Sequence, residues 1–170
     1  MNLHKNYPVY NTTFIDDMRS IVEEAAANFP DRTALSYKVH PSDTDVVKVS
    51  FPQWRDDVRN LGTALISKGF REKNIALIGE NSYGWCCSFF AVMAIGSVIV
   101  PVDKELAPED IAGIIDATGC VAAIVGKTAR AKFDALLAAG SCPTVKSVIL
   151  VEPSPETVFP GREVFSLQQL

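Results

Sequence analysis

Between residues 75 and 151, short and largely apolar runs alternate with segments that repeat apolar residues at helical spacing. The apolar runs are residues 75–78, 98–102, 121–125 and 145–151. The helical segments are residues 82–95, 108–118 and 128–139. A continuous apolar run, rather than an alternating one, indicates a strand that is buried on both faces. The pattern therefore predicts an α/β fold with a mostly parallel sheet, helices on both faces and right-handed crossovers.

The residues before this region predict a helix followed by a small β-hairpin. Thr13 and Asp16 have the spacing of a capping box, which predicts that the first helix starts there. Its apolar stripe begins at Phe14, and Pro30 ends it. Two β-like runs, residues 34–39 and 46–49, are joined by a polar link and predict the hairpin.

A second helix is predicted directly after the hairpin. Ser50 and Gln53 have capping-box spacing, and Pro52 lies near the helix start, where proline is well tolerated. An apolar stripe at helical spacing follows, made up of Trp54, Val58, Leu61 and Leu65. Gly69 supplies the stop signal at the carboxyl end.

Residues 84–102 carry no charged side chain, and their length alone is compatible with a membrane span. Gly96, Ser97 and Pro101 interrupt this stretch, however. Its first half is aromatic and rich in Ala and Met, whereas its second half is β-branched. We therefore expect a buried helix that leads into a buried strand, and no transmembrane segment.

Composition and charge exclude several classes of protein. With 48% apolar residues in 170, the chain is not a disordered tail. The net charge of −4 leaves no basic excess for a nucleic-acid partner. The first ten residues lack the apolar core of a signal peptide, so we expect a cytoplasmic protein. Its cysteines, Cys86, Cys87, Cys120 and Cys142, are expected to be reduced, buried thiols rather than zinc ligands or disulfides.

Two loops resemble nucleotide-binding motifs without completing them. Residues 79–84 follow the first predicted parallel strand, but Asn81 stands where the dinucleotide-binding pattern needs its second glycine. Residues 126–128, Gly-Lys-Thr, match the end of a P-loop. That motif also needs a glycine at position 121, where this chain has Val121, so the backbone amides cannot wrap a phosphate. Neither loop predicts a nucleotide site.

No catalytic arrangement is visible by spacing alone. Three adjacent pairs carry suitable groups: Asp56-Asp57, Glu109-Asp110 and Cys86-Cys87. Both acidic pairs lie on predicted helix surfaces, which favours solvated faces. The two thiols lie in the apolar helix, where nothing nearby in the sequence lowers a thiol pKa, so packed thiols are expected.

The last residues carry another capping-box pattern, Ser166 with Gln169, and the chain ends one residue later. A helix is therefore expected to begin at the end of this sequence. That favours a chain cut from a longer protein over a frayed terminus.

Longer segments resemble the N-terminal part of the AMP-forming (adenylate-forming) acyl-CoA synthetase superfamily. Residues 68–85 read KGFREKNIALIGENSYGW, and residues 91–103 read AVMAIGSVIVPVD, close to the family pattern A-x-x-x-x-G-x-x-x-V-P-L-D. Residues 29–35 and 51–65 match further family regions in kind. Within the family, GENS and DKEL, at 79–82 and 103–106, are most similar to long-chain fatty-acid–CoA ligases.

The resemblance implies a fold and a reaction. The fold is part of the N-terminal domain of the adenylate-forming enzymes, with residues 1–170 as a single α/β unit. The reaction uses ATP and Mg²⁺ to convert a carboxylate into an acyl-adenylate, and the CoA sulfur then displaces AMP. The family's phosphate loop, its aspartate motif and its catalytic lysine have no counterpart in this sequence. We therefore assign no catalytic residue and no metal ligand.

The resemblance also suggests contacts for CoA. By similarity, the loops after residues 102 and 125 lie on the side that approaches the CoA nucleotide. They carry Lys104, Lys127 and Arg130, which are candidates for CoA phosphate contacts. The alternative is that all three are solvated surface charges.

The sequence thus predicts an N-terminal segment of a ligase that joins a long-chain fatty acid to CoA, inactive by itself. The remainder of the enzyme is its expected partner, and none of the cofactors is expected to bind tightly to this segment. The alternatives are a ligase of another carboxylic acid, or a non-catalytic binding module derived from such an enzyme. Apolar sheet surface left exposed is expected to drive self-association.

Overall fold

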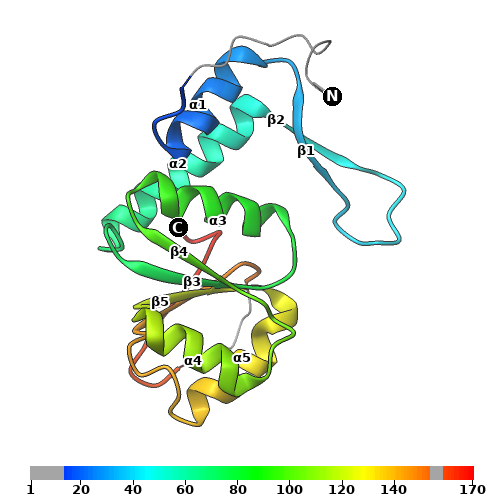
Figure 1. Ribbon diagram of the computed structural model, residues 1–170. Helices are drawn as coiled ribbons and strands as arrows, with labels where there is room; N and C mark the ends of the chain where they lie inside the picture. The colour runs from blue at the N-terminus through cyan, green and yellow to red at the C-terminus, as the bar shows by residue number, and fades with distance from the viewer. Residues whose placement is uncertain (1–13, 154–158) are drawn as a thin grey trace, which may run out of the picture.

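The computed structural model describes residues 14–153 and 159–170, and at its centre lies a five-stranded sheet (Figure 1). The strands are β3 (Asn74–Ile78), β4 (Val98–Val102), β5 (Ala122–Val125), β6 (Ser147–Leu150) and β7 (Glu163–Ser166). Their order across the sheet is β4-β3-β5-β6-β7, and every neighbouring pair is parallel. The predicted α/β class and the four predicted strands are confirmed, and β7 is an addition.

Helices cover both faces of this sheet, as Figure 1 shows. On one face lie α3 (Tyr83–Ala94) and α2 (Phe51–Ser67), with α1 (Met18–Asn28) packed against both of these helices, and on the other face lie α4 (Pro108–Thr118) and α5 (Arg130–Ala138). In β3, Ile75 and Leu77 join the core on the α2–α3 side. Ala76 and Ile78 join the core on the α4–α5 side. Burying one Ile or Leu side chain stabilises a fold by about 1.5–3 kcal/mol, so β3 holds both layers together.

The hairpin and the second helix form as predicted. β1 (Thr33–Tyr37) and β2 (Val47–Ser50) pair antiparallel in a separate two-stranded sheet, which projects from the main body in Figure 1. Ser50 is the N-cap of α2, and its hydroxyl accepts a hydrogen bond from the Gln53 N–H at 3.3 Å. The predicted apolar stripe of α2 is buried at Trp54, Val58, Leu61 and Leu65.

The start of the first helix differs from the prediction. α1 begins at Met18 with Asp17 as its N-cap, and the Asp17 carboxylate accepts hydrogen bonds from the N–H and hydroxyl of Ser20 at 2.7 and 2.9 Å. Phe14 precedes the helix and is 86% exposed, and Thr13 lies outside the described residues. Asp17 offers the same three-residue spacing, and a carboxylate interacts more favourably with the positive end of a helix than a hydroxyl does.

The uncharged stretch of residues 84–102 becomes α3 and β4, as expected. Ser82 caps α3 by accepting a hydrogen bond from the Trp85 N–H at 3.1 Å. Among the described residues, no helix has both the length and the apolar character that a membrane crossing needs. β4 lies at one edge of the sheet, where Val98 is 56% exposed.

The predicted helix start at Ser166 is instead the end of β7 and a single turn. The Gln169 side chain accepts a hydrogen bond from the Ser166 N–H at 2.9 Å, and the Gln169 N–H donates to the Ser166 carbonyl at 3.0 Å. The capping-box residues therefore make their contacts around a turn. The sequence does not predict β7, because this strand is short and only two of its side chains, Val164 and Phe165, are apolar.

Candidate functional site

The loops that follow the parallel strands lie together at the carboxyl edge of the sheet. Along the chain, β3 is followed by β4 on one side and then by β5 on the other. In open α/β sheets such a reversal of direction marks the crevice where ligands commonly bind. The candidate site is therefore built from the loops after β3, β4, β5 and β6.

Two glycines close the crevice between β3 and β5. The Gly126 N–H donates to the Ile78 carbonyl at 2.8 Å, so the pairing of the strands continues one residue beyond β5. A Cβ atom on Gly79 would lie 2.9 Å from the Cα of Gly126, and one on Gly126 would lie 3.0 Å from the Cα of Gly79. The two backbones touch where a ligand would otherwise enter, and glycine at both positions permits that approach.

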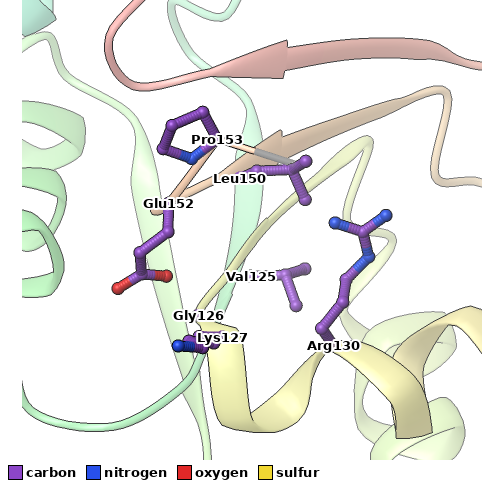
Figure 2. A pocket seen from close by; sticks show the side chains of 7 residues that line it. All are labelled: Val125, Gly126, Lys127, Arg130, Leu150, Glu152 and Pro153. Carbon is purple, nitrogen blue, oxygen red and sulfur yellow. The ribbon is translucent and has the colours of Figure 1, made fainter. Parts of the chain in front are cut away.

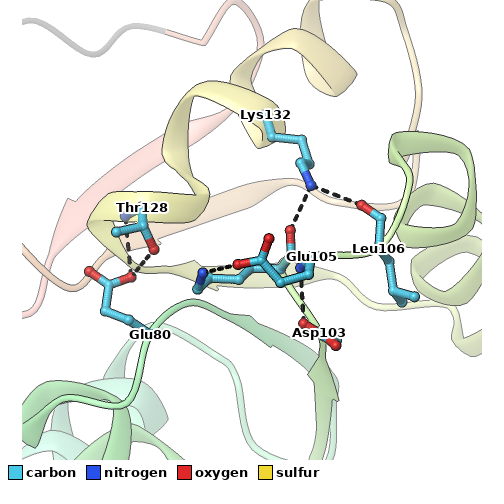
Figure 3. Close-up of polar contacts among 7 residues, drawn as sticks. Glu80, Asp103, Glu105, Leu106, Thr128 and Lys132 are labelled. Atoms are coloured by element: carbon cyan, nitrogen blue, oxygen red, sulfur yellow. Dashed lines mark hydrogen bonds and ion pairs between the residues drawn. The ribbon is translucent and has the colours of Figure 1, made fainter.

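A carboxylate bridges the same two loops. Glu80, from the loop after β3, reaches η1 (Lys127–Ala129), the single turn before α5. Its Oε2 accepts hydrogen bonds from the Thr128 N–H at 3.2 Å and the Thr128 hydroxyl at 2.5 Å (Figure 3). Burial raises the pKa of Glu80, but these hydrogen bonds and the nearby Lys104 ammonium outweigh burial and leave the pKa below its ordinary value. The Glu80 carboxylate thus occupies the Thr128 N–H and hydroxyl, which a bound phosphate would otherwise use as hydrogen-bond donors.

The loop after β4 is held by a lysine from α5. Lys132 donates from its Nζ to the carbonyl oxygens of Lys104 at 2.6 Å and Leu106 at 2.9 Å (Figure 3). Within the loop, the Asp103 carboxylate accepts a hydrogen bond from the Glu105 N–H at 2.9 Å. The Lys104 side chain pairs with Glu105, and this contact raises the pKa of Lys104. Polar contacts therefore order this loop, together with the packing of Leu106 against the core.

Two hollows at this edge adjoin the loops of the β3–β5 junction. The first, of about 400 Å³, is lined by the loops after β3 and β4 and includes Asn81, Trp85 and Lys104. The second, of about 260 Å³, is lined by the loops after β5 and β6 (Figure 2). The closed crevice at Gly79 and Gly126 lies between the loops that line the two hollows.

The smaller hollow combines two cations with one carboxylate. In Figure 2, Lys127 and Glu152 lie on one side of it and Arg130 on the other. The Arg130 Nε lies 2.7 Å from Asp134 Oδ1, and the guanidinium carbon lies 5.4 Å from the centre of the Phe159 ring. The Oε2 atom of Glu152 is buried and has no hydrogen-bond partner in the described part of the chain.

Comparison with known proteins identifies the family of this chain. The family model described as AMP-binding enzyme matches residues 22–166. The chain belongs to the AMP-binding enzyme family. It is 32% identical over 96 residues to 4-hydroxybutyrate–CoA ligase 2 of Metallosphaera sedula, covering 56% of this chain and 16% of that protein. It is 34% identical over 82 residues to the long-chain-fatty-acid–CoA ligase FadD13 of Mycobacterium tuberculosis, covering 48% and 16%.

Solved structures support the fold of this AMP-binding family member. The R395G mutant of coronafacic acid ligase from Pectobacterium brasiliense superposes with a TM-score of 0.76 at 15% identity, covering 90% of this chain and 28% of that one. At such low identity the likeness establishes the fold alone. The chain spans 16% of the length of the two curated relatives described above.

The structure brings together two of the three cations predicted from the family resemblance. Lys127 and Arg130 line the same hollow. Lys104 lines the other hollow, where it pairs with Glu105. The sequence does not point to Glu80 as a partner of this region, because its contact with η1 joins segments that lie 48 residues apart. The sequence feature that could have indicated this contact is a glycine directly after each of two predicted strands, at Gly79 and at Gly126.

The acidic pair Asp56-Asp57 is not entirely solvated, contrary to the expectation from helical spacing. The Tyr83 hydroxyl donates to the Asp57 carboxylate at 2.5 Å, and the Tyr83 ring stacks on Tyr37 with centroids 5.5 Å apart. Burial, followed by the hydrogen bond to Asp57, raises the pKa of Tyr83. Asp57 therefore anchors α3 to α2, an interaction that helical spacing does not reveal.

The four cysteines are free thiols. Cys87, Cys120 and Cys142 are buried, as expected, whereas Cys86 is half-buried. Burial raises the pKa of Cys87 to about 12 and that of Cys142 to about 11. Thiols with such values stay protonated at neutral pH and are poor nucleophiles. The adjacent Cys86 and Cys87 are packing residues of α3.

Proposed function

We propose that this chain is the N-terminal part of an ATP-dependent ligase that joins a carboxylic acid to CoA through an acyl-adenylate. Family membership supports this, as do the names of the two curated relatives, each a CoA ligase. The structural observation that carries the proposal is the hollow lined by Lys127 and Arg130 at the carboxyl edge of a parallel sheet. That edge is where α/β sheets bind ligands, and cations of this kind recognise phosphate groups.

The chemistry explains why such an enzyme needs two steps. A carboxylate is a poor acyl donor, because its negative charge resists attack by a nucleophile. Transfer of AMP from ATP forms a mixed anhydride and releases pyrophosphate, and the CoA sulfur then attacks the acyl carbon and expels AMP. A bound Mg²⁺ neutralises phosphate charge in reactions of this class. Residues 14–153 and 159–170 contain no group of three His, Cys, Asp or Glu side chains that could hold a metal ion, so we assign none of these residues to Mg²⁺.

Within that ligase, we propose that Lys127 and Arg130 contact a phosphate of CoA. A hollow of about 260 Å³ falls below the range of about 300–1,000 Å³ typical of complete ligand pockets, so it suits one group of CoA rather than the whole molecule. Glu152 lines the same hollow and opposes an anion there. Lys104 contributes less, because it lines the other hollow.

For the acid, we propose a long-chain fatty acid. The support is the resemblance of residues 79–82 and 103–106 to long-chain fatty-acid–CoA ligases, together with the 34% identity to FadD13. The similarity to a 4-hydroxybutyrate–CoA ligase makes a short hydroxy acid the main competitor. Acid-dependent pyrophosphate release, measured on the ligase that contains this chain with a panel of acids, decides between them. Turnover of short acids alone would reject the fatty acid.

The CoA contact is tested by amide NMR titration of the 170-residue chain with CoA and with dephospho-CoA, which lacks the 3′-phosphate. We expect CoA to shift the amides of residues 126–130 more strongly than dephospho-CoA does. Lys127→Ala and Arg130→Ala each remove a charge-assisted contact and should weaken CoA binding by roughly tenfold. Glu152→Gln removes an opposing charge and should strengthen binding.

Arg71→Ala is the matched control, because Arg71 precedes β3 at the opposite edge of the sheet and is exposed. It should leave CoA binding unchanged. Equal responses to CoA and dephospho-CoA, or equal loss of binding in Arg71→Ala, would show that Lys127 and Arg130 are solvated surface charges.

A further inference from the structure

We propose that Glu80 is a positioning residue that holds Lys127 and Arg130 in place for an anionic ligand. The inference rests on the proposed function, because it takes the hollow beside these two cations as a phosphate contact. Glu80 does not line that hollow. It acts through Thr128, which lies between the two cations along the chain.

The contact is placed to control the turn that carries the cations. Glu80 Oε2 accepts both hydrogen bonds from one residue, from the Thr128 N–H (3.2 Å) and from the Thr128 hydroxyl (2.5 Å). Two bonds to the backbone and side chain of the same residue restrain its position and its orientation. Lys127 precedes this residue directly, and Arg130 begins α5 two residues later, so both share its restraint.

Close packing of Glu80 on Gly126 further restrains the turn that carries Lys127. The Glu80 Oε2 atom would lie 2.9 Å from a Cβ on Gly126, so the carboxylate packs directly on the backbone of the loop after β5. The Gly126 N–H is bonded to Ile78, the last residue of β3. The turn that bears Lys127 is thus held on both sides of its first residue, by the end of β3 at Gly126 and by Glu80 at Thr128. A shift of Glu80 cannot occur without loosening that turn.

The negative charge of Glu80 has an electrostatic effect on anion binding that opposes its positioning effect. The two effects predict different results when Glu80 is removed. A carboxylate near Lys127 and Lys104 lowers the positive potential that an anion would meet. If charge neutralisation were its main effect, removing Glu80 would strengthen anion binding. If positioning is its main effect, removing Glu80 weakens anion binding, because the cations lose their fixed geometry.

Two substitutions at Glu80 separate these effects in the 170-residue chain. Glu80→Ala removes both the charge and the acceptor. Glu80→Gln removes the charge but keeps an amide oxygen that accepts from Thr128. We expect Glu80→Ala to weaken CoA binding, measured by NMR titration, by roughly fivefold, because Thr128 loses both hydrogen bonds to Glu80 and the turn loosens. Glu80→Gln should bind CoA at least as tightly as the unaltered chain.

Hydrogen exchange of the Thr128 amide gives a readout that needs no ligand. The exchange rate should rise in Glu80→Ala and stay low in Glu80→Gln. Thr128→Ser keeps both donors and should behave as the unaltered chain. Glu72→Ala is the control for charge, because Glu72 is exposed in the turn before β3, at the opposite edge of the sheet. Circular dichroism confirms that each variant is folded.

Tighter CoA binding in Glu80→Ala would overturn the positioning role, and so would an unchanged Thr128 exchange rate in that variant. Loss of CoA binding in Glu80→Gln equal to that in Glu80→Ala would overturn it as well. A different result would reject only the proposed CoA contact. In that case CoA and dephospho-CoA would shift the amides equally, while the Thr128 exchange rate would still depend on Glu80. The two proposals therefore fail in different measurements.

Discussion

Tyr83 and Asp57 illustrate how a partner decides the role of a single side chain. Asp57 belongs to an acidic pair whose spacing indicates a solvated face of α2, yet its carboxylate accepts the Tyr83 hydroxyl at 2.5 Å. Both side chains also line a hollow of about 400 Å³ between α2, α3 and the residues after β7. The hydrogen bond therefore ties two helices together at the border of an apolar surface, where water competes less with it.

Tyr83→Phe removes this hydroxyl and leaves the ring in place. We expect the free energy of unfolding to fall by about 1–2 kcal/mol, because the half-buried Asp57 carboxylate loses a hydrogen-bond donor. Urea denaturation measures the change. Tyr37→Phe is the matched control on the stacked ring, and it should change stability by less than about 0.5 kcal/mol. An equal loss in both variants would contradict a specific role of the Tyr83–Asp57 hydrogen bond.

At the scale of elements, local signals set most helix starts, and close backbone contacts set how the loops meet. Ser50 and Ser82 each cap the helix that the sequence predicts after them. The junction of β3 and β5 depends instead on two glycines whose backbones touch. A glycine in a helix and a glycine at such a junction serve different purposes, and substitution separates them.

Gly126→Ala and Gly113→Ala form a matched pair. At Gly126 a methyl group would lie 2.9 Å from Glu80 Oε2 and 3.0 Å from Gly79 Cα, so we expect a loss of about 1–3 kcal/mol in stability. Gly113 lies inside α4, and its Cβ position has no atom within 4 Å, so alanine there should stabilise by about 0.5–1 kcal/mol. Thermal or urea unfolding measures both changes. Equal effects in the two variants would contradict a tight contact between the loops.

The elements also show where local signals mislead. Thr13 and Asp17 both precede apolar residues at helical spacing, and α1 starts at the carboxylate because it satisfies two donors of Ser20. β7 has too few apolar residues to stand out, yet it pairs in register with β6 from Ser147 to Leu150. A strand of this kind forms because a buried neighbour offers free hydrogen-bonding groups, which is a property of the assembled sheet.

At the scale of the whole molecule, β4 is the edge strand at which the sheet could pair with another chain. β4 forms one edge, with Val98 exposed, and Pro101 lies within the same strand. A proline on an edge strand removes one backbone donor and hinders pairing with a second sheet. Self-association through this edge therefore depends on apolar contact at residues such as Val98 rather than on continuous strand pairing.

The chain is expected to self-associate weakly at high concentration. Val98→Lys places a charge on the exposed edge and should lower the average mass measured by light scattering at the same concentration. Val47→Lys, in β2, is the control, because Val47 is 37% exposed and belongs to the separate two-stranded sheet. A monomer at every concentration would contradict self-association, and an equal effect of both variants would contradict the role of the edge.

The candidate site was only partly accessible to prediction. The family resemblance indicates Lys104, Lys127 and Arg130 as cations on loops at one side of the sheet, and the structure places all three at its carboxyl edge. Their division between two hollows follows from the closed β3–β5 junction, which no local pattern encodes. Lys132 likewise holds the loop after β4 through two carbonyl contacts that join residues 26 and 28 positions apart.

The sequence by itself determines the α/β class, the alternation of strands and helices, the Ser50 cap of α2 and the family, because these depend on local periodicity, capping spacing and motif order. The tertiary structure decides the strand order, the added strand β7, the Tyr83–Asp57 bond, and the closure of the crevice by Gly79, Gly126 and Glu80. These features join residues far apart in the chain. Their free energy comes from packing and hydrogen bonds that exist only after the sheet has assembled.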